Sequence, residues 1–260
     1  MIARLVTVLG FLPVLAMTRV HAAPPLVVAH RGASAEAPEN TAAAIRLGIE
    51  QGADLVEFDI RSTRDGIPIL VHDEDLRRCG GRSDKVVDLD YETASQIDVG
   101  SWFDAKFTGE RMIPLEEAVA LCLEAGVRPL IERKTGTPEE IIAALNKIDA
   151  LEKVTIIAFD WDFLAAFRQL SPKTPIAPLG KKDLASQLPE ILEIEPRPEW
   201  VGWKNQDLDR EGVEAAHTAG LKVNVWTVDS AKDVAKHLAL GVDSITTNRP
   251  AATRGLIEAR

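Results

Sequence analysis

The sequence predicts an α/β fold of the closed (β/α)₈ or TIM-barrel type, and three observations predict it. Short runs rich in β-branched and apolar residues alternate with amphipathic stretches of about a dozen residues, which is typical of βα units around a parallel sheet. Eight of these pairs follow one another, and eight is the number that closes such a barrel. The chain has 260 residues, and these barrels commonly occupy about 200 to 250 residues as one domain.

The expected strands are short runs of Val, Ile, Leu, Thr and aromatic residues, which favour extended structure. In chain order they cover residues 26–30, 55–61, 128–134, 154–159, 175–179, 200–204, 222–228 and 244–247. Between them, apolar residues recur at three- and four-residue spacing, which predicts helices that each cover one side of the sheet. In chain order these helices cover residues 40–51, 115–125, 138–148, 163–170, 183–193, 210–219, 231–240 and 251–259.

The second expected strand carries acidic residues where a buried strand normally carries apolar ones. Side chains alternate across a strand, so the apolar residues of 55–61 share one face while Glu57 and Asp59 share the other. If helices cover the apolar face, the two carboxylates point into the barrel, where they are costly unless a cation or hydrogen bonds compensate them. This strand therefore predicts a site for a hard cation.

One connection breaks the alternation, because more than fifty residues separate the second strand from the next expected helix. The Asp65-Gly66 turn signal predicts that residues 67–72 form a short strand. The polar, glycine-containing remainder, about residues 73–112, is predicted to form a small insertion over one mouth of the barrel.

The first 22 residues have the pattern of a secretory signal peptide. They contain two arginines and no acidic residue, an apolar run from Leu5 to Met17, and Val20-His21-Ala22, which fits the small-residue rule for cleavage. No apolar run in the chain approaches the roughly 20 residues that a spanning helix needs. We therefore expect an exported protein, periplasmic or secreted, with residues 23–260 as one barrel domain and no stable membrane span after cleavage. A retained N-terminal anchor is the alternative.

The net charge limits the classes of binding partner, and the cysteine content limits the disulfides that the chain could form. The formal net charge of −10 argues against nucleic acid or an anionic membrane as the main partner. Cys79 and Cys122 are the only cysteines, and export would permit a disulfide between them. Two separate thiols are the alternative, because Cys122 falls in an apolar helical pattern.

Charged side chains gather at the carboxyl ends of the expected strands, where barrels of this kind place their active sites. The first strand ends in His30 and Arg31, the third ends in Glu132 and Lys134, and His72 follows the short strand before the insertion. Three carboxylates in one small volume would repel one another by about 4 kcal/mol for each pair at about 4 Å. A divalent cation would remove that cost, and oxygen ligands favour Mg²⁺ or Ca²⁺ over zinc, with Mn²⁺ also compatible. Together with two histidines and two basic residues, the set indicates phosphate ester chemistry.

These residues stand in motifs that occur in a fixed order along the chain. The motifs are His30-Arg31-Gly32, Pro38-Glu39-Asn40-Thr41, Glu57-x-Asp59, Asp65-Gly66-x-Pro68, His72-Asp73, Gly100-Ser101-Trp102-Phe103, Glu132-x-Lys134, Trp226-Thr227-Val228 and residues 241–250. The ordered set covers nearly the whole mature chain and resembles the glycerophosphodiester phosphodiesterase family. The resemblance implies a TIM barrel with a small insertion after the second strand, and metal-dependent hydrolysis of small-molecule glycerophosphodiesters to sn-glycerol 3-phosphate and an alcohol.

The resemblance also implies a role for each site residue. The metal ligands would be Glu57, Asp59 and Glu132, the acid and base His30 and His72, and the phosphate-binding residues Arg31 and Lys134, with Trp226 as a wall of the substrate site or ordinary barrel packing. Which histidine is the acid stays open, and so does the identity of the first nucleophile, water or a substrate hydroxyl. Asn248 departs from the family pattern, because an Asp is common there.

Three other functions remain as alternatives. If Trp102, Phe103 and Phe107 form an exposed patch instead of packing the insertion, the substrate could be a lysophospholipid, cleaved by a lysophospholipase D reaction. A non-catalytic phosphate-binding barrel would lack an acid or a histidine, and none is missing. Enolisation or aldol chemistry needs neither two histidines nor two phosphate clamps. His217 and His237 lie in helical patterns away from strand ends and are expected at the surface.

Overall fold

The computed structural model describes residues 23–259, and the predicted signal peptide at residues 1–22 lies outside that part of the chain. The strands are β1 (Leu26–His30), β2 (Leu55–Ser62), β3 (Pro68–Leu70), β4 (Arg128–Arg133), β5 (Thr155–Ala158), β6 (Ile176–Gly180), β7 (Trp200–Lys204), β8 (Lys222–Trp226) and β9 (Ser244–Thr247). The helices are α1 (Ala42–Glu50), α2 (Arg77–Gly80), α3 (Tyr91–Ala94), α4 (Leu115–Glu124), α5 (Pro138–Asn146), α6 (Trp161–Leu170), α7 (Leu184–Ile191), α8 (Arg210–Thr218), α9 (Ala231–Leu240) and α10 (Pro250–Glu258). Three short 3₁₀ helices are η1 (Val86–Asp88), η2 (Ala105–Phe107) and η3 (Leu151–Lys153).

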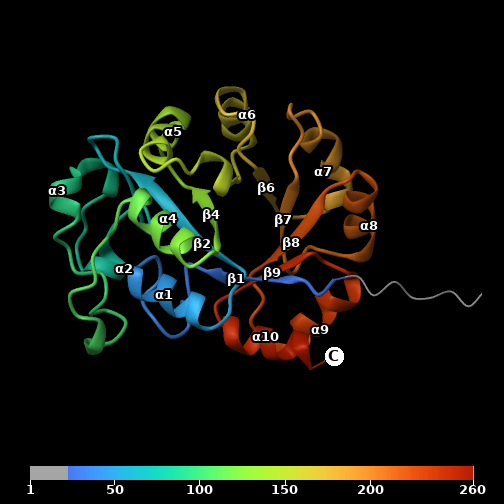
Figure 1. Cartoon of the computed structure of the whole chain (residues 1–260), viewed down its shortest axis with the longest axis horizontal. Coiled ribbons are helices and arrows are strands. Elements are labelled where there is room, and N and C mark those ends of the chain that lie inside the picture. Colours follow the sequence, from blue (N-terminus) through green and yellow to red (C-terminus); the bar gives the residue numbers. More distant parts are fainter. Residues whose placement is uncertain (1–22, 260) are drawn as a thin grey trace, which may run out of the picture.

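Eight parallel strands close into a barrel, with the long helices outside them (Figure 1). The strand order is β1-β9-β8-β7-β6-β5-β4-β2, and β1 pairs with β2 to complete the ring. The short strand β3 lies antiparallel against the end of β2, with Leu70 opposite Ile60. The predicted TIM barrel is therefore confirmed, and each predicted strand and barrel helix is present with its ends shifted by no more than two residues.

The two faces of β2 meet different environments, as the alternation predicts. Val56, Phe58 and Ile60 are fully buried and pack with side chains of the helix layer, among them Ile45 of α1 and Val119 of α4. The opposite face points into the barrel, whose interior is filled by a small apolar cluster of Val28, Leu130, Ile157, Ala177 and Leu179. The acidic residues of β2 therefore lie on the barrel side, at the end of the strand beyond this cluster.

The long connection after β2 folds as a small unit beside the barrel. It contains β3, α2, η1, α3 and η2, and its own buried cluster includes Ile69, Leu76, Val86, Ile97 and Met112. Trp102, Phe103 and Phe107 form a chain of edge-to-face contacts in its last loop, and Trp102 is 39% exposed.

Side-chain caps set the starts of several barrel helices. Thr137 accepts a hydrogen bond from the Glu140 backbone N–H, and the Glu140 carboxylate accepts one from the Thr137 backbone N–H, which forms a capping box at α5. Asp160 caps α6 by accepting from the backbone N–H of Phe163. The capping box coincides with the predicted start of α5 at residue 138, whereas α6 begins two residues before its predicted start at residue 163.

Two expectations about single side chains are resolved by the structure. His237 is fully buried, so the expectation of a surface residue is wrong: it lies on the inner face of α9, 2.6 Å from Asn205 Oδ1 through its Nε2. Cys79 and Cys122 are both free. They belong to separate apolar clusters, one in the insertion and one in the helix layer.

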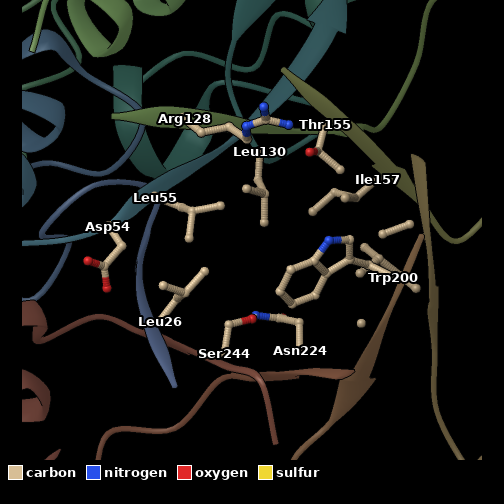
Figure 2. Close-up of a pocket in the computed structure, with 13 residues that line it drawn as sticks. Leu26, Asp54, Leu55, Arg128, Leu130, Thr155, Ile157, Trp200, Asn224 and Ser244 are labelled. Carbon is tan, nitrogen blue, oxygen red and sulfur yellow. The ribbon is translucent and has the colours of Figure 1, made fainter. Parts of the chain in front are cut away.

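The barrel has a cavity at each end. A cavity of about 280 Å³ lies at the amino ends of the strands, and Figure 2 shows Leu26, Leu55, Leu130 and Trp200 pointing into it. None of the eight predicted site residues lines this cavity. A second cavity, of about 180 Å³, lies at the carboxyl ends of the strands and is lined by seven of them. Within residues 23–259, no helix is long and apolar enough to cross a membrane.

Candidate active site

Strand pairing places the predicted site residues side by side at the carboxyl end of the barrel. In the β1–β2 pair, His30 lies opposite Glu57, and in the β2–β4 pair, Asp59 lies opposite Glu132. Residues paired in a sheet share a face, so these side chains form a continuous polar row across three strands. The register of the sheet therefore brings a histidine and three carboxylates to one place.

The three carboxylates form one buried cluster. Glu57, Asp59 and Glu132 each offer an oxygen within 4.8 Å of the other two, and the residues are 3%, 0% and 8% exposed. Burial, together with the negative charge of Asp59, raises the pKa of Glu57 to about 8 and that of Glu132 to about 7. Burial alone would also raise the pKa of Asp59, but the charges of Arg31 and Lys134 outweigh it and bring that pKa to about 2.

Two basic side chains contact this cluster but leave one of its carboxylate oxygens without a hydrogen-bond partner within residues 23–259. Arg31 Nε lies 3.0 Å from Asp59 Oδ2, and Lys134 Nζ lies 3.1 Å from Asp59 Oδ1 while also contacting Glu132 Oε1. Glu57 Oε1 is buried and has no hydrogen-bond partner among the residues that the structure describes. A buried carboxylate oxygen without a partner is costly, and an all-oxygen donor set of this kind fits Mg²⁺, Ca²⁺ or Mn²⁺.

The loop after β1 holds the cluster from one side through an unusual backbone. Arg31 and Asn40 have positive φ angles of 55° and 58°, a conformation that residues other than glycine adopt rarely. In this backbone conformation, the Arg31 N–H donates to Glu57 Oε2 at 2.9 Å. Asn40 Nδ2 donates to Asp59 Oδ2 at 2.9 Å, and Asn40 Oδ1 accepts from the Asp59 backbone N–H at 3.0 Å. These bonds orient two of the three carboxylates.

His30 is held by an amide. Its Nδ1 lies 2.7 Å from Asn248 Oδ1, which also accepts from Ser34 Oγ. Asn248 Nδ2 donates to Asp229 Oδ2 at 2.6 Å, so the amide oxygen must face the histidine, and His30 Nδ1 carries the proton. The lone pair is then on His30 Nε2, which faces Glu57 Oε2 at 4.0 Å. Burial and the neighbouring charge of Arg31 lower the pKa of His30.

His72 is held by a carboxylate. Its Nδ1 donates to Asp73 Oδ1 at 2.7 Å, and Asp73 Oδ2 accepts from Arg78 Nε at 2.7 Å. Although burial opposes ionisation, the hydrogen bonds from Arg78 and His72 bring the pKa of Asp73 to about 2. Burial, with the charge of Arg31, lowers the pKa of His72, although the charge of Asp59 and the hydrogen bond to Asp73 act in the opposite direction. The two histidines therefore differ in the charge of the group that holds them.

The site cavity has a polar side and an apolar side. Its lining residues are His30, Arg31, Glu57, His72, Glu132, Lys134, Ile157, Phe159, Leu179, Asn224, Trp226, Thr227 and Thr246. The rings of Phe159 and Trp226 meet edge to face at 5.5 Å between centroids, and Phe159 is 45% exposed. A phosphodiester fits this division, because its charged centre needs cations while its carbon substituents can lie on the aromatic wall.

The structure brings all eight predicted site residues together. Seven line the cavity, and the eighth, Asp59, lies beneath it, fully buried between Arg31 and Lys134. Other residues contact the site without having been assigned to it from the sequence, notably Phe159 on the cavity wall and Arg78 behind His72. Asn248 stood out in the sequence only as a departure from a family pattern, although it holds His30.

Comparisons with known proteins agree with this geometry. The profile of the glycerophosphoryl diester phosphodiesterase family matches residues 30–252. The chain is 32% identical over 238 residues to the glycerophosphodiester phosphodiesterase of Caldanaerobacter subterraneus, across 89% of this chain and 97% of that one. It is 31% identical over 246 residues to the glycerophosphodiester phosphodiesterase of Bacillus subtilis, across 86% and 84%. Among solved structures, it is similar to an Oleispira antarctica phosphodiesterase in complex with the product sn-glycerol-3-phosphate, with 27% identity, a TM-score of 0.82, and coverage of 90% and 97%.

Proposed function

Because this chain belongs to the glycerophosphoryl diester phosphodiesterase family and is a hydrolase of glycerophosphodiesters, we propose that it cleaves them with one divalent cation and two histidines. The products would be sn-glycerol 3-phosphate and an alcohol. One observation carries this proposal: the two histidines, two of the three carboxylates and both basic residues face the same cavity of about 180 Å³.

Glu57, Asp59 and Glu132 would hold the cation. When bound, it would polarise the phosphoryl oxygens and offset the charge that develops on them. Arg31 and Lys134 already lie against the cluster and would contribute to phosphate binding from the same side. Asn40 and the Arg31 backbone N–H keep two of the carboxylates oriented.

The partners of the two histidines divide the acid and base roles. His30, with its proton on Nδ1 and a neutral amide as acceptor, offers the lone pair of Nε2 as a base toward the attacking water or substrate hydroxyl. His72 donates to an ionised carboxylate, which works against the burial that lowers its pKa and so favours proton donation to the leaving alcohol. A pair of groups with different environments in one cavity is the arrangement that acid and base catalysis needs.

A change of leaving group tests this division. p-Nitrophenolate leaves without protonation, so His72→Ala should lose much less activity on bis(p-nitrophenyl) phosphate than on glycerophosphocholine. His30→Ala should lose a factor of about 10² to 10⁴ on both substrates. Equal losses for the two variants on both substrates would contradict the role assignment. Full activity of either variant on glycerophosphocholine would contradict two-histidine catalysis.

Soluble glycerophosphodiesters and lysophospholipids differ in the glycerol part of the substrate, because a lysophospholipid carries an acyl chain there. Trp102 packs edge to face on Phe103 instead of lying over the cavity, which favours a soluble substrate. The exposed ring of Phe159 keeps the lysophospholipase D alternative open, because it extends the apolar wall toward solvent. Rates on glycerophosphocholine and lysophosphatidylcholine should favour the soluble diester, and a clear preference for the lipid would overturn that choice.

Export is proposed on the pattern of residues 1–22. Cell fractionation followed by N-terminal sequencing should find the protein outside the cytoplasm with its sequence starting after Ala22. An intact N-terminus in the cytoplasm would contradict it.

A further inference from the structure

Arg78 of the insertion donates from each of its three guanidinium nitrogens to two carboxylates beside the active site. Its Nε donates to Asp73 Oδ2 at 2.7 Å, and its Nη1 and Nη2 donate to Glu39 Oε2 and Oε1, each at 2.8 Å. A planar guanidinium can make this forked contact, and a lysine ammonium cannot reproduce it.

Each of these carboxylates holds a different residue of the site. Asp73 Oδ1 accepts from His72 Nδ1 at 2.7 Å. Glu39 Oε1 accepts from Arg31 Nη1 at 2.9 Å, and Arg31 continues to Asp59. The Glu39 side chain is only 14% exposed, so its charge depends on these two arginines more than on water. Burial opposes ionisation of Glu39, but Arg78 and Arg31 outweigh it and lower its pKa.

The rest of the insertion keeps Arg78 in this position. The guanidinium carbon lies 5.3 Å from the centre of the Trp102 ring, which is the geometry of a cation–π contact. Trp102 is fixed in turn, because its Nε1 donates to the Val99 carbonyl at 2.8 Å. Arg78 is thus held by the insertion on one side and by the two carboxylates on the other.

We propose that Arg78 is a positioning residue that sets both His72 and Arg31, so that the insertion orients the catalytic machinery from beside the barrel. The proposal rests on the proposed function, because it takes His72 as the acid and Arg31 as a phosphate-binding residue. Partners that orient site residues from behind typically contribute about 10 to 100-fold to activity, and small displacements of positioned groups have effects of that size.

The two branches predict different kinetic effects. Glu39→Gln disturbs the Arg31 branch and should mainly raise KM, because Arg31 binds the phosphate. Asp73→Asn disturbs the His72 branch and should mainly lower kcat, because His72 acts on the leaving group. Arg78→Gln removes the support of both branches and should raise KM and lower kcat, each by about tenfold.

The experiment measures kcat and KM for glycerophosphocholine with saturating divalent cation, with thermal unfolding of every variant alongside. Arg77→Gln is the matched control, because Arg77 lies on the same helix, its side chain is 71% exposed, and within residues 23–259 its ion pair is with Asp75 at 3.4 Å, away from the site. It should keep wild-type kinetics. Arg78→Lys keeps the charge and the aliphatic stem, so it should fold like the wild type and still show both kinetic defects. In the Asp73→Asn background, Arg78→Gln should add only the KM effect.

Arg78→Lys or a folded Arg78→Gln with kcat and KM within about twofold of the wild type would overturn the proposal. The proposal would also be overturned if Arg78→Gln changed both kcat and KM by its full amount in the Glu39→Gln background and again in the Asp73→Asn background. Such additivity would mean that Arg78 does not act through these two carboxylates. The proposed function fails by a different result: wild-type turnover that needs neither cation nor His72. The two failures are therefore distinguishable.

Discussion

Asn248→Asp replaces the amide that holds His30 with a carboxylate. In the wild type, Asn248 Nδ2 donates to Asp229 Oδ2 at 2.6 Å, and Asn248 Oδ1 accepts from His30 and Ser34. The Asn248 backbone N–H also donates to Asp229, at 2.7 Å. The substitution turns the closest of these hydrogen bonds into a contact between two carboxylates.

The size of the effect follows from that distance and from exposure. Two like charges about 4 Å apart repel by about 1 kcal/mol in water and about 4 kcal/mol at an effective dielectric of 20. Asp229 is exposed and Asn248 is half-buried, so about 2 kcal/mol is expected, including the lost hydrogen bond. The introduced carboxylate should turn away from Asp229, which leaves His30 Nδ1 without a fixed acceptor and should lower kcat about tenfold.

Urea unfolding and steady-state hydrolysis of glycerophosphocholine measure the two effects. The double variant Asp229→Asn/Asn248→Asp exchanges the amide and the carboxylate, so it should recover most of the stability and activity that Asn248→Asp loses. Asp229→Asn alone should cost about 1 kcal/mol, because one amide oxygen replaces two carboxylate oxygens as acceptor. An Asn248→Asp variant as stable and active as the wild type, or a double variant no better than the single one, would refute this reading of the His30 support.

Three further predictions concern stability. Burial lowers the pKa of His237 to about 4, below its unfolded value of about 6.5, so the free energy of unfolding should fall by up to about 3 kcal/mol as the pH drops from 6.5 to 4. In urea unfolding, His237→Gln should flatten this pH dependence, and an unchanged pH dependence would contradict the prediction. Gly32→Ala should lower the free energy of unfolding by about 3 kcal/mol and reduce activity, because Gly32 has φ +80° and an added Cβ would lie 2.3 Å from the Ala44 carbonyl carbon. Wild-type stability in calorimetry would contradict this prediction. Thr137→Ala removes the capping box of α5 and should cost about 1 kcal/mol in the same assay, whereas no change would mean that the cap is replaced by water.

The barrel could be predicted because its signals are local. Alternation along β2 places Glu57 and Asp59 on the face opposite the apolar residues, and the structure has that face toward the barrel interior. Helix spacing and strand composition locate the other strands and the long helices of the barrel to within two residues. The order of eight βα pairs then restricts the closed sheet to one topology, which puts the strand ends together.

Two supports of the site, Asn248 behind His30 and Arg78 behind Glu39, could not be predicted because each joins residues far apart in the chain. His30 and Asn248 are 218 positions apart, and Arg78 and Glu39 are 39 apart. Such contacts depend on loop backbones, such as the positive φ of Arg31 and Asn40, and no periodicity encodes those. His237 shows the same limit in a helix: its spacing was compatible with either face, and the buried Asn205 on the neighbouring loop makes the inner one favourable.

The central claim is that a divalent cation held by three buried carboxylates drives hydrolysis between two histidines. Chelator-treated protein, assayed for release of glycerol 3-phosphate from glycerophosphocholine before and after adding Mg²⁺, Ca²⁺ or Mn²⁺, tests it most directly. We predict that activity is lost on chelation and restored by at least one of these ions, and that folded Glu57→Gln stays at least 100-fold below the wild type with every ion. Full activity after chelation, or in Glu57→Gln, would contradict the claim.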